Sequence, residues 1–208
     1  MISYPESDEV LAGLGSKVVQ GLVHAVVQAR ADLLRYRMRE PAVVAQHSER
    51  GLANWIHDRM WAHLVAVLDG HPEVTLSEGE PTRELVVGLR YRLRIKRHRD
   101  GGQVSSYGTQ TALEFFAQGH QDTFPGLEEL RLTAGYEWDA DARDIGDAVL
   151  SLRDGKDHIV WLEHLVDTGE LGGSGAVQPV RPSTPSPALP SIEVPGFGQH
   201  ATTEDERK

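Results

Sequence analysis

The chain has 208 residues, a formal net charge of −10 and no cysteine. This length suits one domain of about 150 residues with a tail. The lack of cysteine excludes disulfides, thiol nucleophiles and cysteine-based zinc modules. No apolar run approaches the ~20 residues that span a bilayer, and the first residues lack a signal-peptide pattern. We therefore expect a cytoplasmic protein.

Charge is unevenly distributed along the chain. Residues 1–99 carry 14 Lys and Arg against 12 Asp and Glu, whereas residues 100–208 carry 7 against 19. This acidic balance disfavours bulk binding to nucleic acid, although a local basic patch can still contact phosphates. Carboxylates of the second half can therefore neutralise a basic patch in the first half.

Two amphipathic helices are predicted in the first 70 residues. Apolar residues recur every three or four positions over about residues 7–38, which indicates one long helix, and Pro41 ends it. Ser48 is a favoured N-cap for a second helix that ends at Gly70. The short connection predicts that the two helices lie antiparallel and form an N-terminal layer.

After Gly70 the hydrophobic pattern changes to the alternation that is typical of β-strands. It predicts a short strand at residues 74–76 and a long strand at residues 84–99. Residues 100–102 contain two glycines and suit a tight turn. We therefore expect residues 103–107 to return as the next strand.

One helix is expected within the sheet region. Thr111 and Glu114 have the spacing of a capping box, which predicts a short helix to about Gly119. Three further strands are predicted at residues 129–138, 145–152 and 158–165. An Asp-Gly turn at residues 153–157 joins the last two strands as a hairpin.

These elements define an α+β fold, in which an N-terminal helical hairpin packs on a mostly antiparallel sheet with one inserted helix. After about Gly172 the chain is rich in Pro, Gly, Ser and Thr, a composition that cannot bury enough apolar surface to fold. The predicted organisation is a flexible N-terminus at 1–6, the hairpin at 7–70, the sheet with its inserted helix at 71–171 and a disordered tail at 172–208.

The most informative segment is the alternating run from Arg90 to Arg99, which is strongly basic within an acidic protein. Successive side chains of a strand point to opposite faces. The cationic or titratable residues therefore share one face: Arg90, Arg92, Arg94, Lys96 and His98. The other face suits a hydrophobic core and carries Tyr91, Leu93 and Ile95.

Five such groups on one face repel one another unless something neutralises them. Three interpretations are open. The first is internal pairing with carboxylates, for which the candidates are Glu129, Glu137 and Asp139. The second is an acidic protein partner, and the third is nucleic acid.

The second helix is predicted to carry a mixed polar and aromatic face, at three- and four-residue spacing, made of Arg50, Asn54, His57 and Trp61. Arg and Trp are enriched as anchors of protein interfaces. The alternative is that Trp61 covers the edge of the sheet while the polar residues are solvated. Neither interpretation implies catalysis.

The motifs give no support for metal or cofactor chemistry. A restriction-type nuclease places Glu two residues before its Lys, whereas Arg94 precedes Lys96 here and would repel a cation. His158 and His164 would lie about 20 Å apart along a strand, too far to bind one ion. No His-Glu-x-x-His, Gly-x-Ser-x-Gly or P-loop pattern is present. We expect no cofactor and no metal.

Four stretches carry a resemblance to a known group of proteins: Leu93–His98, Ser105–Ala112, Leu130–Tyr136 and Val160–Leu162. Over about residues 45–166 the chain resembles a small bacterial family encoded beside helix-turn-helix proteins with an ImmA/IrrE-type metallopeptidase domain. Those pairs occur in mobile elements and antiphage toxin-antitoxin systems. The resemblance implies an antitoxin-like component that restrains the peptidase-type toxin, and it carries over no catalytic residue.

The leading hypothesis is a non-enzymatic antitoxin-like or regulatory binding protein, with the helical hairpin and the basic strand as partner surfaces. Its predicted partner-binding residues are Arg50, Asn54, His57, Trp61, Arg90, Arg92, Arg94, Lys96 and His98. The alternative is a nucleic-acid-binding regulator that uses the basic strand at residues 90–99, with salt-sensitive affinity. A third class, an enzyme of unrecognised type, requires a pocket in which titratable groups converge.

Overall fold

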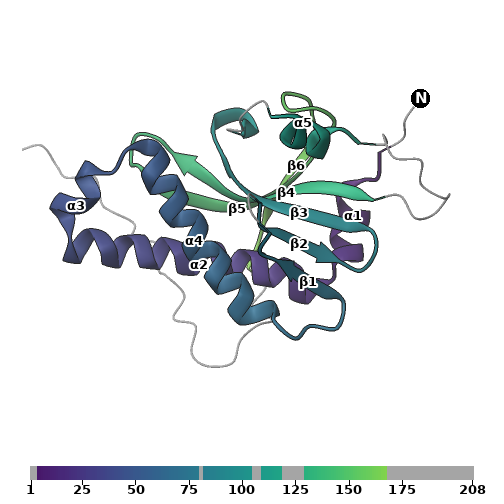
Figure 1. Ribbon diagram of the computed structural model, residues 1–208, viewed down its shortest axis with the longest axis horizontal. Helices are drawn as coiled ribbons and strands as arrows, with labels where there is room; N and C mark the ends of the chain where they lie inside the picture. The colour runs from purple at the N-terminus through teal and green to yellow at the C-terminus, as the bar shows by residue number, and fades with distance from the viewer. Residues whose placement is uncertain (1–3, 80–81, 105–108, 119–128, 168–208) are drawn as a thin grey trace, which may run out of the picture. The chain divides into compact units, whose positions relative to one another are not determined.

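The computed structural model describes residues 4–79, 82–104, 109–118 and 129–167 (Figure 1). Within these ranges the helices are α1 (Ser7–Leu14), α2 (Ser16–Arg39), α3 (Pro41–Gln46), α4 (Glu49–Leu68), the 3-10 turn η1 (Asp100–Gly102) and α5 (Gln110–Phe116). The strands are β1 (Val74–Ser77), β2 (Glu84–Val87), β3 (Tyr91–His98), β4 (Leu130–Asp139), β5 (Asp144–Arg153) and β6 (Ile159–Leu165).

The strands form one sheet in the order β1-β2-β3-β4-β5-β6. Every neighbouring pair is antiparallel except β3 and β4, which are parallel. The connection between these two parallel strands contains α5, as a parallel pair requires a crossover. The predicted α+β class, with a mostly antiparallel sheet and one inserted helix, is confirmed.

The first predicted helix is broken at Gly15, which separates α1 from α2. Gly15 has φ 81° and ψ 150°, a conformation that suits glycine, and the two helices meet at 95°. The expectation of one continuous helix was wrong at this point. Pro41 follows the end of α2 as expected, and it also occupies the first turn of α3, where its missing N–H has no cost.

α2 and α4 run antiparallel across one face of the sheet (Figure 1). Ser48 caps α4 as predicted, because its Oγ accepts the backbone N–H of Gly51 at 3.0 Å. Leu33 of α2 and Ile56 and Leu64 of α4 are completely buried in the main core. No described helix is by itself long and apolar enough to cross a membrane, and α1 with α2 meets that criterion only when counted together across their bend.

The region predicted as one long strand is a hairpin of β2 and β3, so that expectation was wrong. Gly88 has φ 58°, and the turn reverses the chain so that Leu85 pairs with Leu93. Arg90 consequently lies in the turn and is exposed, outside the strand. Because β2 pairs only with the first residues of β3, the second half of that edge of β3 has no partner in β2.

The tight turn predicted after the basic strand is present as η1. Gly101 and Gly102 have φ 67° and 73°, as the turn requires. Val104 then pairs with His98 in an antiparallel bridge. The remainder of the expected return strand, residues 105–107, lies outside the described residues.

The later elements follow the prediction closely. The N-cap of α5 is Thr109, whose Oγ1 accepts a backbone N–H, and not Thr111 as the capping box indicated. β5 and β6 form the predicted hairpin, with Gly155 at φ 93° in its turn. The expected helix end at Gly119 and the tail at 172–208 lie outside the described residues.

Candidate functional site

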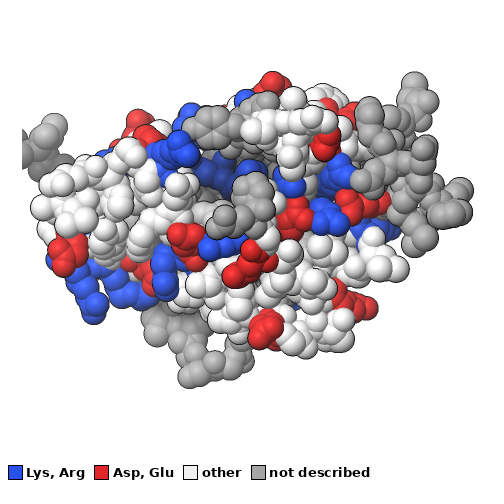
Figure 2. All heavy atoms as spheres, viewed as in Figure 1, with Lys and Arg blue, Asp and Glu red and all other residues white. Residues whose placement is uncertain are grey.

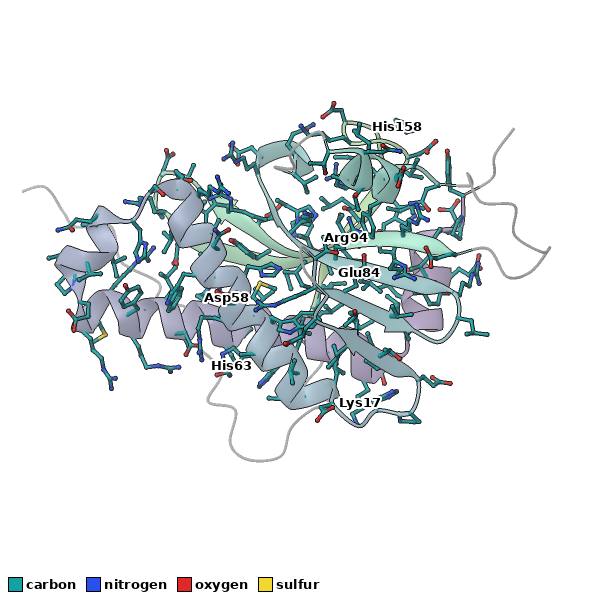
Figure 3. The ribbon with its side chains drawn as sticks, viewed as in Figure 1. Lys17, Asp58, His63, Glu84, Arg94 and His158 are labelled. Carbon is teal, nitrogen blue, oxygen red and sulfur yellow. The ribbon has the colours of Figure 1, made fainter. Side chains whose placement is uncertain are left out.

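Two arginines of the basic strand are neutralised inside the protein. Arg92 and Arg94 both bond Glu84, Arg94 through Nη2 at 2.7 Å, and Arg92 Nε also donates to Glu129 at 2.9 Å. Glu84 and Arg94 lie side by side between β2 and β3 (Figure 3). Burial opposes ionisation of Glu84, yet hydrogen bonds from Arg94 and Arg92 hold its pKa below the usual range. Arg92 and Arg94 therefore have a structural role, as the internal-pairing interpretation predicts.

Other arginines near the strand are paired as well. Arg90 donates to Glu9 at 3.0 Å, and Arg97 donates to Glu49 at 2.9 Å. Of the carboxylates predicted to neutralise the strand, Glu129 does so. Glu137 instead faces His164 at 3.7 Å, and Asp139 accepts a backbone N–H in the β4–β5 turn. These pairs remove most of the charge that a nucleic acid could contact on this strand.

Replacing Glu84 by Gln is expected to lower the free energy of unfolding by about 1 to 2 kcal/mol at pH 7, because Gln lacks the charge and has only one of the two oxygens that accept from Arg92 and Arg94. The lowered pKa of Glu84 means that its contribution is present above pH 4.5 and is lost as the pH falls through its folded value. Urea unfolding at pH 7 and pH 3 measures this change. The exposed Glu73→Gln variant is the matched control, and equal losses in both variants would contradict the assignment.

Two predicted partner-binding residues are buried. His98 has no exposed surface, and its Nε2 lies 3.3 Å from both Thr133 Oγ1 and Ser151 Oγ. Burial, with the nearby Arg153, lowers the pKa of His98 to about 3. Trp61 is 3% exposed and donates its indole N–H to a carboxylate of the same chain. Neither side chain can reach a partner in this conformation.

The remaining predicted residues meet in one open cleft of about 640 Å³ between α4 and the second half of β3. Arg50, Asn54 and His57 line it from α4, and Lys96 lines it from β3. Figure 2 shows Lys and Arg side chains gathered in a hollow beside α4. The sequence placed these four residues on two separate surfaces, and the fold brings them together.

The cleft exists because of how the edge of β3 is paired. β2 covers that edge only up to Leu93, and the next described pairing on the same side is His98 with Val104. Between these points lie residues 94–97, of which Ile95, Lys96 and Arg97 line the cleft, whereas Arg94 bonds Glu84. Among the described residues no strand pairs with this stretch of the β3 edge, and α4 packs beside it, which leaves a groove that a ligand can enter.

The described lining is predominantly cationic, with five Lys or Arg side chains and two carboxylates. The cations are Arg50, Lys96, Arg97, Arg99 and Lys156, and the carboxylates are Glu49 and Asp157. Because Glu49 already pairs with Arg97, it does little to neutralise the others. The cleft is therefore a site of positive potential on an acidic protein.

Lys96 is the cation of β3 that the described residues leave without an ion pair. Burial and the neighbouring Arg94 lower its pKa. Burial also lowers the pKa of His57, and the charges of Arg83 and Lys96 act in the same direction. Positive charge is thus crowded and partly desolvated here, which favours an incoming anion.

Tyr136 lines the same cleft from β4, and the sequence pattern does not distinguish it from a core residue. Its side chain is 1% exposed, and its hydroxyl has no hydrogen-bond partner among the described residues. Burial raises the pKa of the phenol, so it stays protonated and can donate. A buried polar group without a partner costs about 1 to 3 kcal/mol.

The cleft supplies positive charge and hydrogen-bond donors to a carboxylate or phosphate group. His57, Lys96 and Tyr136 also bring titratable groups together, which is the condition that an enzyme of unrecognised type requires. In the described ranges no three His, Asp or Glu side chains lie close enough to hold a metal ion. Binding of an anion is the chemistry that these groups favour most directly.

Comparisons with models of protein families, with characterised proteins and with solved structures gave no match to this chain. Its function is therefore inferred from the cleft.

Proposed function

We propose that this chain is a non-enzymatic regulatory binding protein whose α4–β3 cleft holds an acidic segment of a protein partner. The observation that supports this most is Lys96, a partly desolvated cation that faces the cleft without an ion pair among the described residues. The free protein bears the cost of that charge, and a carboxylate from a partner offsets it.

An acidic peptide fits this site better than a nucleic acid does. Nucleic-acid affinity comes from many phosphate contacts along a basic surface. Here Arg90, Arg92 and Arg94 already bond carboxylates of the same chain, and the net charge of −10 repels a long polyanion. A short acidic segment needs only the local positive potential of the cleft.

The resemblance suggests a specific partner, the helix-turn-helix protein with an ImmA/IrrE-type metallopeptidase domain. In that setting the chain is an antitoxin-like component of an antiphage toxin-antitoxin pair, and it restrains the toxin by binding it. This finer role rests on the resemblance, whereas the binding of an acidic segment rests on the cleft.

The test is co-expression of the full chain with the protein encoded beside it. We expect the two to elute as one complex in size-exclusion chromatography, and the complex to weaken as salt is raised from 50 to about 500 mM. Expression of the neighbour alone should slow growth, and the chain should relieve this effect. Absence of both a complex and a growth effect would remove the antitoxin role. Failure of a hexaglutamate peptide to bind the isolated chain would separately remove the acidic-segment role of the cleft.

A further inference from the structure

A second surface lies on α2, on the side that faces away from the core. Val27, Leu34 and Met38 are 47%, 58% and 75% exposed. Together with the half-buried Ala31 they are spaced by four, three and four residues, so they form one apolar line along the helix. These four residues are called the α2 seam. Single exposed apolar residues are common, but an aligned set at coiled-coil spacing is typical of a helix-binding face.

Arginines flank the α2 seam on both sides. At about 100° of rotation per residue, Arg30 and Arg37 lie along one border and Arg35 along the other. Arg30 donates to the carbonyl of Ile145, and Arg37 contacts Asp144 at 3.3 Å. Arg35 pairs with Asp32, a carboxylate that Arg59 also contacts, so these four arginines outnumber the two carboxylates that they contact. Figure 2 shows Lys and Arg gathered at the lower left, where α2 ends in Figure 1. The apolar line therefore has cationic borders.

We propose that the α2 seam docks an amphipathic helix of another protein, with Asp or Glu at the positions that flank its apolar face. In paired helices the flanking charges select the partner, and opposite charges are favoured. A second copy of this chain would place Arg30, Arg35 and Arg37 against arginines of its own α2. Charge complementarity therefore points to an acidic helix and away from self-association. This surface is independent of the α4–β3 cleft.

Two model peptides of three heptads test the proposal, both with Leu at the a and d positions. One has Glu and the other has Lys at the flanking e and g positions. Fluorescence anisotropy against the full chain measures their affinities. We expect the Glu peptide to bind at least about tenfold more tightly than the Lys peptide. Leu34→Gln combined with Met38→Gln should weaken it about tenfold, while Leu89→Gln, which removes a leucine that is 84% exposed elsewhere, should not.

Further variants distinguish docking at the α2 seam from binding in the cleft and from self-association. Arg35→Gln should weaken binding of the Glu peptide and reduce its salt dependence, because one border charge is lost. Persistence of Glu-peptide binding in the variant that combines Leu34→Gln with Met38→Gln would place the peptide in the cleft beside Lys96 and would overturn the proposal. Equal binding of the two peptides would overturn the proposal. So would a dimer in light scattering that Leu34→Gln dissociates, because the seam would then be covered by a second copy.

Discussion

His98 is expected to lower the free energy of unfolding by about 1.4 kcal/mol for each pH unit between pH 6 and pH 4, because it is held neutral in the folded protein. Its pKa is lowered to about 3 by burial and by the charge of Arg153. In the unfolded chain the same imidazole has an ordinary pKa of about 6.5 and takes up a proton as the pH falls. Acid therefore stabilises the unfolded state, and the loss levels off near the folded pKa.

The change of the free energy of unfolding with pH identifies the role of His98 better than the free energy of unfolding at a single pH does. His98→Gln removes contacts to Thr133 and Ser151 and should lower stability at pH 7, but it should also reduce the slope between pH 6 and pH 4 by about 1.4 kcal/mol per pH unit. Urea unfolding followed by circular dichroism gives both quantities. His158, which is exposed, provides the matched control, and His158→Gln should keep the slope of the unaltered protein. An unchanged slope in the His98→Gln variant would show that other groups carry the acid sensitivity.

The sequence predicted the elements whose boundaries are local. Ser48 caps α4 as its side-chain chemistry indicates, and the glycines of η1 turn the chain as expected. Gly15 and Gly88 were harder to interpret, because an amphipathic or alternating pattern can continue through a glycine that breaks the element. The break at Gly15 divides one expected helix, and Gly88 turns one expected strand into a hairpin.

The same turn at Gly88 explains why the site was predicted only in part. Alternation placed Arg92, Arg94 and Lys96 on one face, but it could not tell which of them would meet a carboxylate. That depends on the register between β2 and β3. The register sets Glu84 beside Arg92 and Arg94, and the pairing of β3 with β2 stops before Lys96. The cleft results from how the strands pair. The alternation of residues within a single strand does not predict that pairing.

Convergence of the α4 face with β3 could not be predicted either. The spacing of Arg50, Asn54 and His57 defines a helix face, but packing decides that it turns toward the edge of β3. Tyr136 has the pattern of a core residue, and it is buried like one. Only its hydroxyl, unpaired within the described part of the chain, distinguishes it from a structural tyrosine. A polar group that the fold leaves unsatisfied cannot be recognised before the fold is known.

Lys96→Glu should weaken binding of a hexaglutamate peptide by about a hundredfold, or about 2.7 kcal/mol, because it replaces the attracting charge of the cleft by a repelling one. Lys96→Met removes the charge at similar length and should weaken binding about tenfold. Titration calorimetry at low salt measures both affinities.

Lys96→Met should also stabilise the free protein by roughly 0.5 to 1 kcal/mol, because it relieves a desolvated charge beside Arg94. A structural lysine would behave in the opposite way and would lose stability on this change. Lys17, an exposed lysine of α2, gives the matched control, and Lys17→Met should alter neither stability nor affinity appreciably. If Lys96→Met lowered stability and left the peptide affinity unchanged, Lys96 would have a structural role like that of Arg92 and Arg94. Gain of stability with loss of binding is the combination expected of a residue kept for a partner.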